Sequence, residues 1–177
     1  MTATLAVALG LSLAARAQAP GLGVRINGDA GSTLYVPVKV NDAFMVEGTL
    51  SYLHFKNDTG AGTLSSYRTT STEVGAGFFW LKPLGESTRL YAGPRVSHGK
   101  ASTVYGGAPE QRADSQGWTV APTLGVEYFP LRNVSIGGEI GASYGHATGD
   151  RSDFTGHQSV KSTQASTVSS VILRYYF

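Results

Sequence analysis

Residues 118–129 read WTVAPTLGVEYF, and their side chains alternate between two kinds along the segment. One parity is large and apolar: Trp118, Val120, Leu124, Val126 and Tyr128. The other parity is small or polar: Thr119, Thr123 and Glu127. Because successive side chains of a β-strand point to opposite faces, this pattern predicts a strand with one apolar face. Helical spacing of three and four residues does not explain it.

The same alternation returns in seven other segments, separated by turn signals. They are residues 21–27, 33–40, 43–55, 69–81, 88–97, 134–146 and 164–177. Each has one apolar parity and one small or polar parity. A chain of 177 residues is of single-domain size, so the sequence predicts one all-β domain of eight strands.

The connections between these segments differ in length. Residues 41–42, 82–87 and 130–133 are short turns, whereas residues 56–66, 98–117 and 147–163 are long and rich in Gly, Ser, Asp and Thr. The first connection, residues 28–32, is also short. Short turns at one rim and long loops at the other are typical of a membrane barrel whose rims face different compartments. We therefore expect an eight-stranded antiparallel up-and-down transmembrane β-barrel.

Charged residues are segregated within the eight segments. All of them fall on the parity opposite the apolar one: Arg25, Lys39, Glu47, Glu73, Arg89, Arg95, Glu127, Glu139 and Arg174. A charge that faces hydrocarbon costs about 2–4 kcal/mol at mid-bilayer, whereas a charge that faces a polar lumen can form an ion pair. We expect these nine residues to form an ionic network in the barrel interior, which would act as a plug.

The alternation also fits a soluble, lipocalin-like barrel that carries its apolar face inside, around a ligand. Two observations favour the membrane. The polar face has only one or two charges per segment, fewer than a water-washed surface normally carries. The chain also ends on an apolar strand, although protein termini usually fray.

Composition excludes several other classes. There is no cysteine, so disulfides, thiolate zinc sites and cysteine nucleophiles are excluded. The formal net charge is only +2, with no basic block, so we expect no nucleic-acid partner. The sequence has no run of about 20 apolar residues, so it predicts no helical membrane span. No metal-ligand spacing or phosphate loop is present in the sequence, so we expect no metal and no cofactor.

Residues 5–15 (LAVALGLSLAA) have the length of a signal-peptide core and are followed by small residues suited to cleavage. We expect cleavage after Ala17, which divides the chain into a signal peptide, residues 1–17, and a barrel domain, residues 18–177.

The last residues, VILRYYF (171–177), resemble the C-terminal signal of bacterial outer-membrane barrels. With the signal peptide and eight strands, the chain resembles the small OmpA, OmpX and opacity-type family over nearly its whole length. The resemblance implies that the barrel-assembly machinery reads Phe177, Tyr175 and Leu173. It also implies contact with outer-membrane lipid and lipopolysaccharide, and adhesive or structural roles for external loops. We expect a non-enzymatic protein that can bind a surface ligand through loops 98–117 and 147–163.

Three further functions are considered. A general diffusion pore needs sixteen or more strands, so porin activity is excluded. The lipid A 3-O-deacylase family uses a His-x-Ser pair, which His157 and Ser159 match; the family's next Asn is Val160 here, and no glutamate follows Glu139. Pro94 and Pro122, inside neighbouring segments, each remove a hydrogen-bond donor and suggest a lateral opening between these two strands.

Overall fold

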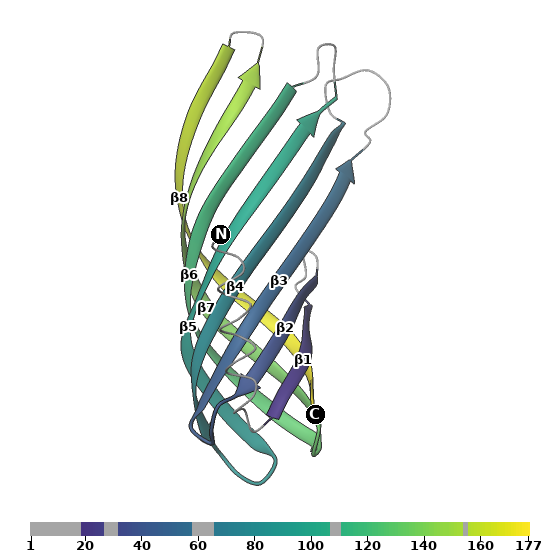
Figure 1. The fold of residues 1–177 in the computed structure, drawn as a ribbon, viewed down its shortest axis with the longest axis vertical. Coiled ribbons are helices and arrows are strands. Elements are labelled where there is room, and N and C mark those ends of the chain that lie inside the picture. Colours follow the sequence, from purple (N-terminus) through teal and green to yellow (C-terminus); the bar gives the residue numbers. More distant parts are fainter. Residues whose placement is uncertain (1–18, 27–31, 58–65, 107–110, 154–155) are drawn as a thin grey trace.

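The computed structural model describes residues 19–26, 32–57, 66–106, 111–153 and 156–177, which form eight β-strands. The strands are β1 (Ala19–Ile26), β2 (Ser32–Lys39), β3 (Phe44–Asn57), β4 (Tyr67–Pro83), β5 (Thr88–Tyr105), β6 (Gln111–Leu131), β7 (Val134–Asp153) and β8 (Gly156–Tyr176). Each pairs antiparallel with the next strand along the chain, and β8 pairs with β1 to close a barrel (Figure 1). The predicted fold class is confirmed. The predicted signal peptide, residues 1–17, lies outside the described residues.

The strand register shows how strongly the strands are tilted. Stepping from Ile26 through the paired residue of each next strand leads to Lys161 of β8. Ile26 itself pairs with Val171, ten positions further along β8. For eight strands this stagger corresponds to a tilt of about 40°, within the range of membrane barrels. The strands in Figure 1 lean accordingly.

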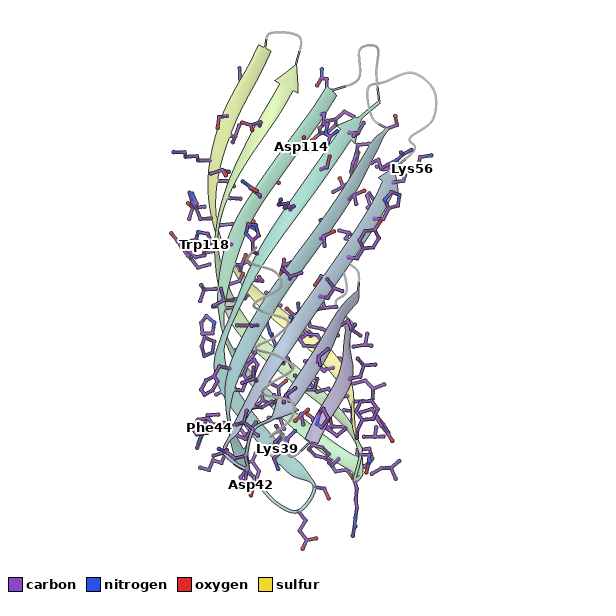
Figure 2. All side chains as sticks on the ribbon, in the orientation of Figure 1. Lys39, Asp42, Phe44, Lys56, Asp114 and Trp118 are labelled. Carbon is purple, nitrogen blue, oxygen red and sulfur yellow. The ribbon has the colours of Figure 1, made fainter. Side chains whose placement is uncertain are left out.

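An apolar belt surrounds the lower half of the barrel. Its large side chains face outward, as shown by Leu50, Val126 and Ile140, which are 48%, 40% and 60% exposed. Outward aromatic residues mark both margins: Phe44, Trp80, Tyr128 and Tyr175 at the turn end, and Tyr52, Trp118 and Tyr144 at the other. At about 3.3 Å per residue and 40° of tilt, the distance from Tyr128 to Trp118 spans about 25 Å, the height of a membrane-barrel belt. Figure 2 shows Phe44 near the lower rim and Trp118 well above it.

The inward parity carries the opposite kind of side chain. Glu47, Glu139 and Arg174 are buried in the lumen, each less than 5% exposed. A small apolar group lies with them: Met45, Phe79, Leu81 and Tyr91. The soluble-barrel alternative, which requires an apolar interior and a charged exterior, is therefore wrong.

The predicted long loops are mostly strand. Strand β5 continues to Tyr105 and β6 begins at Gln111, while β7 continues to Asp153 and β8 begins at Gly156. Residues 98–105, 111–117, 147–153 and 156–163 thus belong to strands, Gly106 follows the end of β5, and residues 107–110 and 154–155 lie outside the described residues. Residues 56–66 are shortened in the same way, because β3 ends at Asn57 and β4 begins at Tyr67. The prediction of long loops was wrong because both faces of these segments are polar, so no alternation marks them as strands.

Strands β1 and β2 have only eight residues each, whereas β8 has 21. Strand β1 pairs with β8 only over residues 171–176. Above that level, residues 156–170 of β8 pair with β7 alone within the described residues. The upper strands therefore form an open sheet that rises from the closed barrel (Figure 1).

Pro94 and Pro122 pair directly across β5 and β6. The β5–β6 pairing is continuous through them, whereas pairing is interrupted between β4 and β5 and between β6 and β7. Each proline lacks the backbone N–H donor that would face the strand on its other side, which is β4 for Pro94 and β7 for Pro122. The structure therefore does not support an opening between β5 and β6. No helix in the described part of the chain is long and apolar enough to cross a membrane.

Candidate functional site

Seven inward charges from six strands meet in the lower lumen, and we call them the luminal ion cluster. They are Arg25, Glu47, Arg89, Arg95, Glu127, Glu139 and Arg174. Strand alternation brings them together, because each occupies the parity opposite the outward apolar residues of its strand. All seven were predicted from the sequence to face inward.

Glu47 is completely buried and bridges two arginines. Arg95 donates from Nη2 to Oε1 of Glu47 at 2.6 Å, and Arg174 donates to the other carboxylate oxygen. The two carboxylate oxygens of Glu47 thus accept hydrogen bonds from two different strands, β5 and β8. Charge-assisted hydrogen bonds of this kind are among the stronger polar contacts in proteins.

Glu127 forms the lower part of the cluster. Arg174 Nη1 donates to its Oε1 at 2.7 Å, and Arg89 donates to its Oε2 from Nη2 at 2.5 Å and from Nε at 3.0 Å. The hydroxyls of Ser135 and Tyr176 complete the shell at 3.0 Å and 2.9 Å. Arg174 therefore connects Glu127 with Glu47, and its side chain is fully buried between them.

Glu139 forms the upper part. Arg95 donates to both of its oxygens, at 3.0 Å and 3.2 Å, and the Tyr91 hydroxyl donates at 2.7 Å. Arg25 is less well compensated, because its closest carboxylate oxygen, on Glu139, lies 4.0 Å from Nη1. Arg25 is therefore the cation of the cluster with the weakest ion pair.

Buried tyrosines complete the cluster, and sequence reasoning missed them. The Tyr35 ring lies against three guanidinium groups, with Cζ–centroid distances of 5.1 Å to Arg95, 5.5 Å to Arg25 and 5.8 Å to Arg174. Tyr91 and Tyr176 lie on the same inward parity and donate to Glu139 and Glu127. Their parity was visible in the sequence, but the predicted interior network contained only charged residues.

Two predicted members of the network lie elsewhere. Lys39 pairs with Asp42 across the lower turn at 2.9 Å, and this contact lowers the pKa of the Asp42 carboxyl below its usual value. Glu73 is exposed higher in the lumen and has no ion pair in the described part of the chain. Parity identifies the face of a residue but not its height in the barrel, so both were grouped with the cluster.

Glycines provide room for the large inward side chains. A Cβ added to Gly23 would lie 2.6 Å from Cγ of Arg174, and a Cβ on Gly125 would overlap the phenol ring of Tyr91. Both glycines lie on the inward parity, and each pairs directly with the residue that needs the room: Gly23 with Arg174, and Gly125 with Tyr91. The cluster therefore depends on small residues beside it as well as on its ion pairs.

Above the cluster the lumen contains a cavity of about 210 Å³. Arg25, Arg95 and Glu139 contribute to its lining from below, together with hydroxyl groups and Glu73. Glu73 and Thr119 also line a wider space of about 370 Å³ further up the strands. The two spaces therefore share part of their wall.

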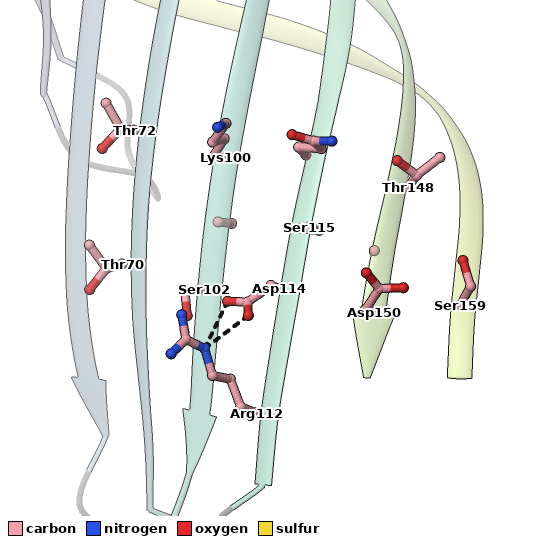
Figure 3. Close-up of a pocket in the computed structure, with 13 residues that line it drawn as sticks. Thr70, Thr72, Lys100, Ser102, Arg112, Asp114, Ser115, Thr148, Asp150 and Ser159 are labelled. Atoms are coloured by element: carbon pink, nitrogen blue, oxygen red, sulfur yellow. Dashed lines mark hydrogen bonds and ion pairs between the residues drawn. The ribbon is translucent and has the colours of Figure 1, made fainter. Parts of the chain in front are cut away.

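The outer face of the sheet above Trp118 and Tyr144 is polar. Lys100, Asp114 and Thr148 share the outward parity of the belt residues and line a groove of about 490 Å³ (Figure 3). Arg112 and Asp114 pair at 2.9 Å on this face. The Ser102 hydroxyl and Arg112 lower the pKa of Asp114 by hydrogen bonding to its carboxylate. Charge thus returns to the outer face beyond the upper aromatic margin, as expected if hydrocarbon ends there.

The weak catalytic candidates are only partly described. Ser159 is exposed on β8, pairs with Asp150 of β7 and lies at the polar groove. The backbone of His157 pairs with Ser152, but its side chain lies outside the described residues. The His-x-Ser interpretation therefore stays a prediction.

The C-terminal residues Leu173, Tyr175 and Phe177 all project outward, and the Tyr175 and Phe177 rings contact edge to face at 5.2 Å. The Phe177 amide donates to the Pro20 carbonyl at 2.9 Å. The end of the chain is therefore fixed at the barrel seam, with three apolar side chains on the lipid-facing surface.

No protein-family model matches the chain, and no curated protein matches it. Among solved structures, it is similar to a major outer membrane protein of Thermus thermophilus, with 15% identity and a TM-score of 0.63 over 90% of this chain and 98% of the other. Ail, the attachment invasion locus protein of Yersinia pestis, shows 18% identity, coverage of 89% and 93%, and a TM-score of 0.45. The N-terminal β-barrel domain of Pseudomonas aeruginosa OprF shows 12% identity, coverage of 90% and 96%, and a TM-score of 0.42. The predicted resemblance to small outer-membrane barrels is confirmed at the level of the fold.

Proposed function

We propose that this protein resides in a bacterial outer membrane as a barrel closed to solute passage, and that it acts through the polar sheet that rises above the membrane. The observation that carries this proposal is the change in the outer face at Trp118 and Tyr144. Below them it is apolar, and above them Lys100, Asp114 and Thr148 share the same parity. Water-exposed strands that extend a membrane barrel provide a surface for partners.

The ion cluster supports the closed interior. Seven charges and three tyrosines occupy the lower lumen, and an eight-stranded barrel has space for little more than its own side chains. The role is structural or adhesive, without catalysis. The outward C-terminal residues Leu173, Tyr175 and Phe177 serve the barrel-assembly machinery, and lipopolysaccharide surrounds the belt in the outer leaflet.

The binding surface lies on strands rather than on the loops expected from the sequence. Residues 98–105 and 111–117 of β5 and β6, with residues 147–150 and 158–163 of β7 and β8, provide hydroxyl, amide and charged groups at the sheet surface. The upper part of β8 also has one edge without a strand neighbour in the described residues, and such edges accept added strands.

The experiment compares a Gram-negative host producing this chain with the same host carrying an empty vector. We expect stronger retention on an epithelial monolayer, unchanged lipid A mass spectra, and no arabinose-driven swelling of liposomes that contain the purified barrel. The double variant Gln116→Arg and Thr148→Arg, which crowds the groove, should reduce retention while the heat-modifiable gel band of the folded barrel stays. Equal retention of producing and empty-vector cells would reject the surface role. Loss of an acyl chain from lipid A would favour the hydrolase, and rapid swelling would show an open pore.

A further inference from the structure

The upper sheet, which β3 to β8 form above Trp118 and Tyr144, has an inner face that can be reached from the side. Strands β1 and β2 end well below the tops of the other strands, so no described strand closes the gap between β8 and β3 at this height (Figure 1). The inner face is concave, because it continues the inside of the barrel. A concave, accessible surface is the usual shape of a ligand site.

Three aromatic rings from neighbouring strands lie together near the top of this face, and we call them the aromatic row. The ring centroids of Phe55 on β3 and Tyr67 on β4 are 5.8 Å apart, and those of Tyr67 and Tyr105 on β5 are 6.4 Å apart. The strand register is constant from the ion cluster upward, so the parity that turns Glu47 inward also turns these rings inward. Phe55 is 47% exposed and Tyr105 is 38% exposed. Grouped aromatic rings that are exposed above the membrane indicate an interaction surface.

Below the aromatic row, the inner face carries small and hydroxyl side chains. The hydroxyls of Thr69 and Thr103 lie 3.1 Å apart and form a hydrogen bond between β4 and β5. Further down lies the groove of about 370 Å³, whose inward residues include Ser71, Ser115 and Gln164. Hydroxyl and amide groups both donate and accept hydrogen bonds, so this surface suits a ligand that does the same.

Charge distinguishes the two faces of the upper sheet. The outer face carries Lys100, Arg112 and Asp114. Among the described side chains of the inner face above the ion cluster, Glu73 is the only charged one. Because partners bind best to surfaces of complementary charge, the inner face favours a neutral ligand.

The main chain of the inner face is already used. Strands β4 to β7 are each paired on both sides at the level of the aromatic row and of the groove. An extended peptide that joins a sheet needs the free main-chain groups of an edge, so it gains no such bonds here. An oligosaccharide fits better, because its hydroxyls can pair with hydroxyl and amide side chains and its C–H faces can pack on aromatic rings.

We infer that the inner face of the upper sheet binds a neutral oligosaccharide of hexose units. The sugar rings pack on the aromatic row, and the sugar hydroxyls bond to the Thr, Ser and Gln side chains below it. Tyr67 contributes most, because it lies in the middle of the row with a ring on each side. The inference rests on the proposed placement of the upper sheet outside the membrane, but not on the outer groove.

The test measures binding of maltoheptaose, cellohexaose and mannohexaose to the purified full chain by titration calorimetry. The micelles are made of lauryldimethylamine oxide, because a detergent with a sugar head would compete. We expect saturable binding of at least one of the three, and shifts of the Tyr67 and Tyr105 ring signals in NMR spectra of the native barrel. Sulfated maltoheptaose should bind no more tightly than the neutral chains, since the inner face offers it no described cation.

Substitutions at the aromatic row should change the affinity in a graded way. Tyr67→Ala should weaken it by about tenfold, because the central ring contact is lost. Tyr67→Phe retains the ring and should stay within about threefold of the native affinity. Tyr52→Ala is the matched control, because Tyr52 is an exposed tyrosine on the outer face, and its affinity should equal the native one. The heat-modifiable gel band shows that each variant is folded.

The double variant Gln116→Arg and Thr148→Arg separates this inference from the proposed adhesion. Its side chains share the outward parity, so it should lose cell retention but bind the oligosaccharides as the native chain does. Three results would each overturn the inference, whatever the retention assay gives: no binding of any of the three neutral chains, equal affinities of the native and Tyr67→Ala proteins, or tighter binding of the sulfated chain. If Tyr67→Ala does not fold, native ring signals that stay unchanged with oligosaccharide overturn it as well.

Discussion

Replacing Arg174 with methionine should lower the free energy of unfolding by about 3–5 kcal/mol, the usual cost of breaking a buried ion pair from one side. Arg174 is fully buried and donates to both Glu47 and Glu127. Methionine fills similar space but leaves both carboxylates without their shared partner in the lumen. Urea unfolding of the barrel in lipid vesicles, followed by the fluorescence of Trp80 and Trp118, measures the change.

Lys39→Met is the matched control for this change. The Lys39–Asp42 pair is at the rim, and the Asp42 side chain is 90% exposed, so we expect its loss to lower the free energy of unfolding far less than Arg174→Met does. If both variants lose the same small amount, the cluster adds no more to stability than a surface pair does, and the account of the lower lumen is wrong.

Placing arginine at Ile140 should destabilise the barrel by about 2–4 kcal/mol and reduce the fraction that folds into vesicles. Ile140 is 60% exposed on the outer face of β7, in the middle of the apolar belt. An arginine there faces hydrocarbon, since the polar groups of the lipid begin only at the two aromatic margins of the belt. The folded fraction is read from the faster-migrating band on a gel run without heating.

Thr148→Arg is the control on the same strand and the same face. Thr148 lies beyond Tyr144, beside the polar groove, where water surrounds the added charge. We expect a change within about 0.5 kcal/mol, as for ordinary surface substitutions. Equal losses at Ile140 and Thr148 would contradict the position of the upper belt margin.

Most of the barrel could be predicted from sequence because lipid imposes one rule on every strand. In segments such as 118–129 and 134–146, the outer face must be apolar and the inner face need not be. The alternation between the two faces is therefore visible in the sequence. The seven members of the ion cluster followed from parity alone. Their contacts did not, since Arg174 is separated from Glu47 by 127 residues and only the closed register brings them together.

The upper strands could not be predicted, because the rule ends where the lipid ends. Ser102 and Thr103 on β5, or Thr148 on β7, meet water or polar neighbours on both faces, so nothing in their order distinguishes strand from loop. The sequence also did not show how high in the barrel an inward residue lies. Glu73 and Lys39 have the inward parity of the cluster, yet one lies in the wide upper lumen and the other at the lower turn.

Prolines illustrate the same limit. The places of Pro94 and Pro122 inside neighbouring segments were visible, but the sequence does not show toward which neighbouring strand each missing donor points. In the barrel, Pro94 interrupts the pairing with β4 and Pro122 the pairing with β7, while the strand pair between them stays intact. Hydrogen-bond direction along a strand depends on register, which parity does not give.

The orientation of the two strand faces can be measured directly with nitroxide labels. The chain has no cysteine, so single cysteines at Trp118, Thr119, Val120 and Ala121 can each carry one label in vesicle-embedded barrels. Collision with oxygen, which concentrates in lipid, should be highest at 118 and 120, and collision with a water-soluble nickel chelate highest at 119 and 121. The opposite phase, with oxygen contact at 119 and 121, would place lipid where the ion cluster lies and would contradict the membrane barrel described above.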